Sequence, residues 1–433
     1  MKRKVIAVLL ATMTVVSLIG CGGSDKKASD QKKDTGDGKV QLSMCWWGSQ
    51  ARNDATQKVV EMYMEENPDV EIKMEFMDWS GYWDKLSTVA AGGNMPDIVQ
   101  MDYAYLNQYQ ASGQLADLGE FMESGVIDTS KFQTDVLESG SVDGKCYALS
   151  LGIQPPAMMY DKEIVEKAGV EIPEYPTWGE IYEIGQKIYD KTGVPTLFPG
   201  DSSTMALFAR SEGKYLYDEI MQGNDKFAKE HFEAVDKFNK AEFALAPDLL
   251  AEKNINEIDT KPIIDQTTWN DFAMACQFPT MAATAGRELG MCMQPKPESA
   301  TSEQNYLKPT MFFSIAESSK NKEEAAKFID WFVNDKECNL ILNAERGVPI
   351  NTDVVEAVKA EADENVKRLF DFTTEAGKMS APIDPPSPAG ANEIGDLVSR
   401  LVEDIRYGDI TPDEATKEFM DSATTILKDA SNE

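Results

Sequence analysis

Aromatic side chains gather with polar side chains at three places in the first quarter of the chain. They are Trp46 with Trp47; Asp78 with Trp79, followed by Tyr82 and Trp83; and Asp102 with Tyr103 and Tyr105. Aromatic rings bring a large contact area at a low rotamer cost, and carboxylates form strong hydrogen bonds with donors. Rings and acids in such groups are typical of a surface that binds a ligand without covalent chemistry.

The elements around these groups place them at one edge of a sheet. Apolar residues alternate over 39–47, 70–76 and 96–101, which predicts strands, and helical spacing covers 54–66 and 80–91. This strand–helix order predicts a parallel, doubly wound sheet. Each aromatic group then follows the carboxyl end of a strand, where open α/β sheets form their ligand crevice.

The two neighbouring tryptophans have different expected roles. Trp46 continues the inward phase of Val40, Leu42 and Met44, so we expect it to pack inside the domain. Trp47 points the opposite way at the last position of the strand. We therefore expect Trp47 to offer its ring to the ligand.

Signatures of catalysis and of metal binding are missing from the sequence. The one histidine, His231, falls on the predicted surface of a helix, with no nucleophile elbow near it. The sequence has no HExxH motif, no Walker loop, no GxGxxG motif and no cluster of His and Cys residues. We expect no catalytic residue, no metal and no cofactor. A secreted glycoside hydrolase stays open as an alternative, because it needs only two carboxylates among 74 acidic residues.

Length and charge limit the class of protein further. A chain of 433 residues is too long for one ordinary domain, so we expect two or three domains or two lobes. Its formal net charge is −32 and its basic residues are scattered, which argues against a nucleic-acid partner.

The N-terminal segment is typical of a secreted lipoprotein. A basic start, MKRK, precedes the apolar residues 5–19, which are too few to span a membrane. The sequence Leu-Ile-Gly-Cys ending at Cys21 matches a bacterial lipobox. We expect residues 1–20 to be a signal peptide, Cys21 to be acylated, and residues 21–38 to be a flexible tether. The remaining cysteines are odd in number and read as small core residues: Cys45, Cys146, Cys276, Cys292 and Cys338.

The rest of the chain continues the α/β pattern. Thr177 and Glu180 predict a capping box at a helix start, and residues 201–271 read as largely helical. Residues 289–293 and 311–315 predict strands, and residues 321–334, 354–374 and 411–429 predict helices. The proline-rich residues 382–388 predict an irregular loop, and residues 384–390 are a candidate to reach the ligand.

Several motifs together resemble the family 1 extracellular solute-binding proteins, the sugar-binding lipoproteins of ABC importers. The matching stretches run nearly end to end: the lipobox, Trp46–Gly48, Gly93–Asp102, Gly113–Leu118, Gly144–Leu149, Met159–Lys162, Ala168–Val170, Thr177–Trp178, Asn321–Phe328 and Arg346–Asn351. Asp161 and Ser150 depart from residues common in the family. No single stretch is decisive, and their order and spacing carry the likeness.

The resemblance implies two doubly wound α/β lobes of the type II periplasmic-binding-protein kind, joined by a hinge that the chain crosses several times. It implies an N-terminal lobe of 39–152 plus 306–352 and a C-terminal lobe of 153–305 plus 353–433. The lobes would close on a sugar and deliver it to a membrane permease, from a monomer anchored outside the cell membrane.

Sugar chemistry assigns roles to the candidate residues. A sugar has apolar C–H faces, which rings cover, and a rim of hydroxyls, which carboxylates and amides bind. The candidates for stacking are Trp47, Trp79, Tyr103 and Tyr105, with Trp269 from the second lobe. The candidates for hydrogen bonding are Asp78, Asp102 and Gln154.

Arg52 leaves the charge of the ligand open. It lies near a predicted helix start, where a ligand carboxylate would be favoured, so an oligosaccharide with uronic acids is one possibility. A solvated arginine is the other. A binding protein for a peptide or another non-sugar solute is a further alternative to a sugar-binding protein.

Overall fold

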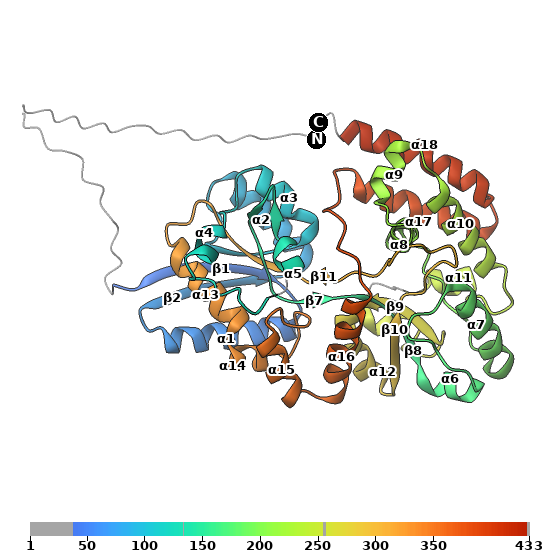
Figure 1. Ribbon diagram of the computed structural model, residues 1–433, viewed down its shortest axis with the longest axis horizontal. Coiled ribbons are helices and arrows are strands. Elements are labelled where there is room, and N and C mark those ends of the chain that lie inside the picture. Colours follow the sequence, from blue (N-terminus) through green and yellow to red (C-terminus); the bar gives the residue numbers. More distant parts are fainter. Residues whose placement is uncertain (1–37, 133, 254–256, 431–433) are drawn as a thin grey trace, which may run out of the picture. The chain divides into compact units, whose positions relative to one another are not determined.

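Three parallel strands connected by two helices begin the fold (Figure 1). The computed structural model describes residues 38–132, 134–253 and 257–430. The strands are β1 (Val40–Trp47), β2 (Val70–Met77) and β3 (Ile98–Met101), and the helices are α1 (Gln50–Glu66) and α2 (Trp79–Ala91). The predicted strand–helix alternation is thereby confirmed. The predicted signal peptide, Cys21 and the tether up to residue 37 lie outside the described residues.

Two later strands complete the first sheet. Strand β12 (Phe312–Ile315) pairs antiparallel with β3 and with β6 (Leu149–Ser150), which gives the order β2-β1-β3-β12-β6. Next to it, β7 (Ile153–Gln154) pairs with β11 (Lys308–Pro309), and Ile153 also bridges to Val348. Three separate stretches of chain therefore meet at one crossing point, as the predicted hinge requires. A short hairpin joins β4 (Ser141–Val142) to β5 (Lys145–Cys146).

The second main sheet has a different connectivity from the first. Strand β8 (Pro156–Asp161) lies between β9 (Asn270–Met274) and β10 (Leu289–Met293), and both neighbours are antiparallel to it. The backbone N–H of Ala275 donates to the carbonyl of Pro155 at 2.9 Å, so β9 ends where β8 begins. Strand β8 runs away from the crossing point and β9 runs back towards it, so the two strands are antiparallel. The prediction that this second sheet is doubly wound is therefore corrected.

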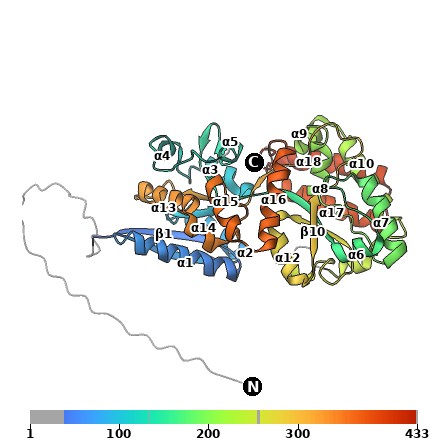
Figure 2. The same ribbon diagram turned by 60° about the horizontal axis from the view of Figure 1, so that its bottom comes forward.

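The remaining helices cover these two sheets. Their bounds are α3 Tyr103–Ala111, α4 Gly119–Glu123, α5 Thr134–Glu138, α6 Lys162–Ala168, α7 Trp178–Thr192, α8 Ser202–Arg210, α9 Leu216–Gln222, α10 Lys226–Asn239, α11 Pro247–Ala251, α12 Phe278–Ala285, α13 Lys322–Asn334, α14 Lys336–Leu342, α15 Thr352–Glu361, α16 Glu364–Lys378, α17 Ala391–Tyr407 and α18 Pro412–Ala430, with 3-10 turns at Ile258–Thr260 and Ala275–Gln277. In Figure 2, α17 and α18 lie together beside α10, in agreement with their contacts.

Buried apolar side chains form two cores within the described residues. The first surrounds the five-stranded sheet and includes Trp46, Phe312 and Phe328. It also includes Val354 of α15 and Phe370 of α16, two helices that follow Val348 in the sequence. The second packs on one face of the antiparallel sheet and includes Phe232 and Phe419, whereas Ala157, Met159 and Leu289 on its other face belong to the first core. The residue bounds of the two lobes stay a prediction, since the chain from Lys39 onward forms one compact unit.

Local sequence signals explain individual helix ends. Helix α7 begins with the predicted capping box: Thr177 Oγ1 accepts the N–H of Glu180 at 3.2 Å, and Glu180 accepts the N–H of Thr177 at 2.7 Å. It ends at Gly193 with φ of 71°, a left-handed conformation that glycine adopts without strain.

Among the described helices, none combines the length and the apolar character that crossing a membrane requires.

Candidate functional site

The carboxyl ends of β1, β2 and β3 lead directly into helix starts. Ser49, Asp78 and Asp102 cap α1, α2 and α3. Asp78 Oδ1 accepts the N–H of Gly81 at 2.8 Å, and Asp102 Oδ1 accepts the N–H of Ala104 at 2.9 Å. Both acids therefore have a structural role that was not anticipated from sequence. They lie at the predicted edge, with Asp78 exposed and Asp102 half-buried.

Trp46 and Trp47 are both buried, on opposite faces of β1. Trp46 is 0% exposed, stacks on Phe76 and donates from Nε1 to Asn53 Oδ1 at 3.0 Å, which confirms it as an anchor. Trp47 is only 7% exposed, because rings from α2 and its start cover it. The rings of Trp79, Tyr82 and Trp83 lie 5.0, 5.1 and 5.5 Å from it. The expectation that Trp47 is an open platform is therefore corrected: Trp47 is a support for other rings.

Trp79 is the ring that reaches the surface. It is the first residue of α2 and remains 43% exposed. Its ring contacts Trp47 and Trp83 edge-on, with Tyr105 at 6.1 Å. Tyr105 in turn stacks on Trp83 at 3.8 Å. Buried rings thus hold one exposed indole at the carboxyl end of β2, where a ligand can stack without first ordering that side chain.

Tyr103 uses its hydroxyl inside the protein. The hydroxyl donates to the carbonyl of Asp384 at 2.7 Å, and the ring stacks on Phe312 at 6.3 Å. Burial raises the pKa of Tyr103 well above its ordinary value. The candidate loop at residues 384–390 therefore begins in contact with this edge of the sheet, through a residue that we expected to stack on a ligand.

The proline-rich residues 380–388, called here the proline strap, are also held from α8. Arg210 forms an ion pair with the carboxylate of Asp384 and donates from Nη2 to the carbonyl of Pro382 at 2.9 Å. A cavity of about 900 Å³ borders the strap and the crossing point, with Ile153, Pro309 and Thr373 in its wall. Tyr103 and Arg210 belong to elements that pack on different sheets, so the strap links the two halves of the chain.

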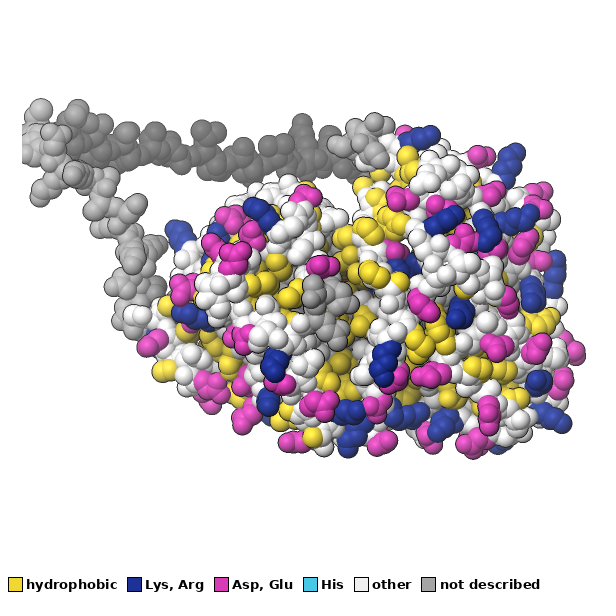
Figure 3. Space-filling view, viewed as in Figure 1, with side chains coloured by type: hydrophobic (Ala, Val, Ile, Leu, Met, Phe, Trp, Pro, Cys, Tyr) yellow, Lys and Arg dark blue, Asp and Glu magenta, His cyan; other side chains and the backbone are white. Residues whose placement is uncertain are grey.

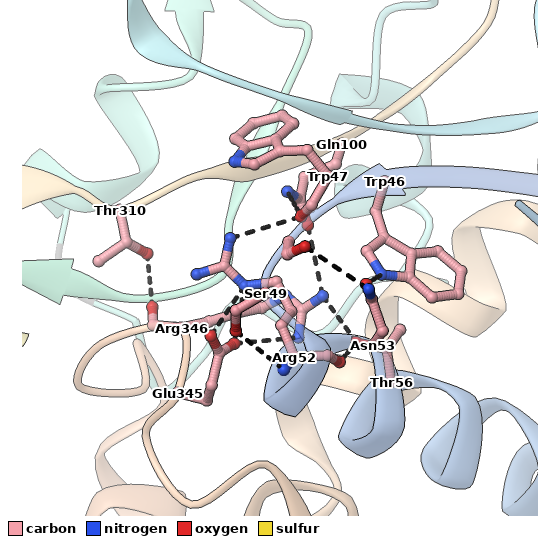
Figure 4. Close-up of polar contacts among 11 residues, drawn as sticks. Trp46, Trp47, Ser49, Arg52, Asn53, Thr56, Gln100, Thr310, Glu345 and Arg346 are labelled. Carbon is pink, nitrogen blue, oxygen red and sulfur yellow. Dashed lines mark hydrogen bonds and ion pairs between the residues drawn. The ribbon is translucent and has the colours of Figure 1, made fainter. Parts of the chain in front are cut away.

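A buried polar network fixes the end of β1 (Figure 4). Gln100 donates from Nε2 to the carbonyl of Trp47 at 3.0 Å, and Arg346 donates to Thr56 Oγ1 at 2.8 Å and to Gln100 Oε1 at 3.3 Å. Arg346 is 2% exposed, and burial lowers its pKa to about 9. Residues far apart in the sequence therefore hold the carbonyl at the end of β1.

Arg52 is paired within the protein. Its Nε lies 2.8 Å from Glu345 Oε2, and its Nη1 donates to the carbonyl of Trp47 at 3.4 Å. The expectation of a solvated arginine is corrected, because Glu345 reaches it from a distant part of the chain. Glu345 is shared between two arginines, since its Oε2 also lies 3.8 Å from Nη1 of Arg346.

The last two predicted residues, Gln154 and Trp269, have different surroundings. Gln154 lies in β7 at the crossing point, and its buried Oε1 has no hydrogen-bond partner among the described residues. Trp269 is 0% exposed and donates from Nε1 to Thr196 Oγ1 at 2.8 Å. The expectation that Trp269 offers a ring to the ligand is therefore corrected: the ring belongs to the second core.

A polar cavity lies beside β9, directly after Trp269 in the chain. This β9 cavity of about 230 Å³ is lined by Lys261, Asp271, Phe272, Gln277, Gln294 and Tyr306, among others. Lys261 Nζ lies 2.8 Å from Asp271 Oδ1, and burial raises the pKa of Asp271. Three oxygens in its wall lack a hydrogen-bond partner within the described chain: Asp271 Oδ2, Gln277 Oε1 and Gln294 Oε1. This site was not expected, because the sequence around Asp271 read as helical and β9 was not predicted.

Cys276, next to the β9 cavity, lies near the charged residues Arg52 and Glu345 at the end of β1. Burial raises the pKa of this thiol to about 11, and the next largest influences on it are the charges of Arg52 and Glu345. Cys276 directly precedes Gln277 of the cavity wall. The turn after β9 therefore lies near the network that ends β1.

All the described cysteines are free thiols. Those other than Cys276 are buried.

His231 lies inside the second core rather than on the surface. Its Nε2 lies 3.1 Å from the carbonyl of Gly200, and burial lowers its pKa to about 4. The predicted surface position was wrong because Phe208 and Phe232 enclose the ring. Within the described residues, no group of three His, Cys, Asp or Glu side chains could hold a metal ion.

Comparisons with known proteins identify the family. The model of the bacterial extracellular solute-binding proteins matches residues 47–337, and the chain belongs to this family. A solved family 1 extracellular solute-binding protein from Alicyclobacillus acidocaldarius shares 26% identity with a TM-score of 0.76, and the match covers 90% of this chain and 98% of that one. The predicted α/β fold class is confirmed.

Two curated relatives whose names state a ligand match about half of the chain. The diacetylchitobiose binding protein DasA of Streptomyces coelicolor is 30% identical over 205 residues, which are 47% of this chain and 47% of that protein. The arabinooligosaccharide-binding protein of Bacillus subtilis is 27% identical over 240 residues, which are 52% of this chain and 53% of the relative. The chain spans about half the length of these curated relatives.

Proposed function

We propose that this chain captures an oligosaccharide or sugar as the substrate-binding component of a carbohydrate ABC importer. The exposed ring of Trp79 carries the proposal, since it is a large apolar face held ready at a sheet edge with polar side chains beside it. The ligands named for the two curated relatives, diacetylchitobiose and arabinooligosaccharide, support a sugar over a peptide.

Capture would combine stacking with hydrogen bonding. One C–H face of the sugar would lie on Trp79, and hydroxyls would reach Asp78 and Asp102 at this edge and Gln154 at the crossing point. Gln154 supports this assignment because its Oε1 is buried without a partner within the described chain. Closure of the lobes would then remove sugar and ring from water, which strengthens both kinds of contact.

The location follows from the same proposal. Cys21 would carry the lipid anchor, and the tether would leave the binding unit free to meet the permease on the outer face of the membrane. The lipobox and the basic start of the chain support this anchor. We propose that the protein acts there as a monomer, with the membrane permease as its partner.

The experiment is a thermal-shift screen of oligosaccharides followed by calorimetry on the best ligand. Trp79→Ala is expected to weaken binding at least tenfold, because the stacking face is lost. Met221→Ala, at another exposed apolar side chain, is the matched control and keeps the affinity. Unchanged affinity in Trp79→Ala would refute Trp79 as the platform. Cleavage of the sugar at an enzymatic rate would favour the glycoside hydrolase instead.

A further inference from the structure

We infer that the β9 cavity takes one neutral sugar residue of the ligand and selects it by its hydroxyl donors, against a uronic acid at that position. This inference rests on the proposed function and adds to it the charge class of the bound residue.

The fully buried side-chain atoms of the cavity wall that lack a hydrogen-bond partner within the described chain are oxygens, which accept hydrogen bonds. Asp271 is only 1% exposed, and its Oδ2 has no partner within the described chain, as is also true of Gln277 Oε1 and Gln294 Oε1. Buried polar atoms in folded proteins are nearly always paired, so such a group in one cavity calls for donors from elsewhere. Sugar hydroxyls supply donors, whereas an ionised carboxylate supplies none.

The charges around the cavity also disfavour an anion. Lys261 is engaged by Asp271 Oδ1 at 2.8 Å and by the carbonyl of Phe272 at 3.2 Å. Asp201 lines the cavity as a second carboxylate and caps α8. The cavity wall thus holds two carboxylates and one ammonium group, which is already bound. A third carboxylate, brought in by a ligand, would be repelled by them.

The walls and the volume suit a single ring. Tyr306 provides an apolar ring in the same wall, a combination that matches the C–H faces and hydroxyl rim of a sugar. The volume of about 230 Å³ is below the range of about 300–1,000 Å³ typical of sites for drug-sized ligands. One sugar residue therefore fills the cavity, and the rest of an oligosaccharide lies outside it.

Matched ligands test the selection by charge. Calorimetry on the wild-type protein compares each neutral oligosaccharide with a uronic counterpart of equal length, including galactobiose against digalacturonic acid and cellobiose against cellobiouronic acid. The neutral member of the best pair is expected to bind at least tenfold more tightly. Equal or tighter binding of the uronic member overturns the inference. Absence of binding by every member contradicts the proposed function, and the inference falls with it.

Variants then test the cavity itself. Gln277→Leu and Gln294→Leu are each expected to weaken the tightest neutral ligand at least fivefold, while Gln222→Leu, at an exposed position, leaves it unchanged. These glutamines are preferred to Asp271→Asn, which leaves Lys261 without its buried partner and can fail to fold. If Trp79→Ala weakens binding and both glutamine variants bind as the wild type does, the inference is overturned and the proposed function stands.

Discussion

Single residues at the sheet edge divide into supports and contacts, and burial decides which is which. Sequence alternation correctly put Trp46 and Trp47 on opposite faces of β1. It could not show that rings from α2 cover the second face, because that depends on packing between elements. The same limit explains Trp269 and His231, whose contacts with Thr196 and Phe208 join segments that are distant in the sequence.

The support role of Trp47 predicts a stability effect. Trp47→Ala removes a buried ring from the cluster and is expected to lower the free energy of unfolding by about 3–5 kcal/mol. Trp79→Ala, at an exposed ring, is expected to change it by about 1 kcal/mol or less. Urea unfolding of both variants measures the difference. Equal losses would show that Trp79 is as much a core residue as Trp47.

The buried histidine predicts a pH effect with a definite sign. The pKa of His231 falls from 6.5 to about 4 in the fold, so below pH 6.5 the unfolded chain binds a proton that the folded chain does not. Stability from the neutral ring is complete above pH 6.5 and is lost as the pH falls towards 4, by about 3 kcal/mol in total.

The chain contains one histidine, so its titration is directly observable. An NMR titration of the imidazole signals should give a pKa near 4. A value near 6.5 would mean that the ring is open to water. His231→Phe, which carries no titrating group, should show less loss of stability than the wild type between pH 7 and pH 4.

The positions of helices and strands were more predictable from sequence than the way these elements pair and pack. Periodicity located the first strands and helices, and Thr177 with Glu180 correctly marked the start of α7. Helix α17 was missed, although Ile394, Leu397 and Leu401 form an apolar face on it. The relative direction of the strands in the second sheet could not be predicted from local sequence signals either. It depends on where the chain returns to the crossing point.

The proline strap predicts an effect at the scale of one segment. Tyr103→Phe keeps the ring on Phe312 and removes the hydrogen bond to the carbonyl of Asp384. The strap is expected to exchange its amide hydrogens faster, with a stability loss of about 1 kcal/mol. Hydrogen exchange with mass spectrometry over residues 380–390 measures this. Tyr105→Phe is the control, and identical exchange in both variants would remove the role assigned to Tyr103.

At the scale of the molecule, the chain is strongly acidic and has two cores within the described residues. Acidic and basic side chains are interspersed on the face in Figure 3, and acids outnumber bases by 74 to 42 in the sequence. The net charge argued against nucleic acid as a partner. The polar cavity at β9 was not predicted, because its walls come from segments as far apart as Asp201 and Tyr306.

Closure of the lobes predicts a change in size on binding. A saturating oligosaccharide is expected to lower the radius of gyration in small-angle X-ray scattering, since the lobes come together on the ligand. The wild type with a non-binding sugar is the control. A radius that stays the same at full occupancy would argue that the binding unit is already closed.

The location of the bound sugar tests the central claim most directly. The measurement is a crystal structure of the protein with the tightest ligand from the screen. We predict one sugar residue in the β9 cavity, with hydroxyls on Asp271, Gln277 or Gln294, and a second residue stacked on Trp79. A sugar that touches neither Trp79 nor this cavity, such as one seated only in the cavity of about 900 Å³ beside the proline strap, would contradict the assignment.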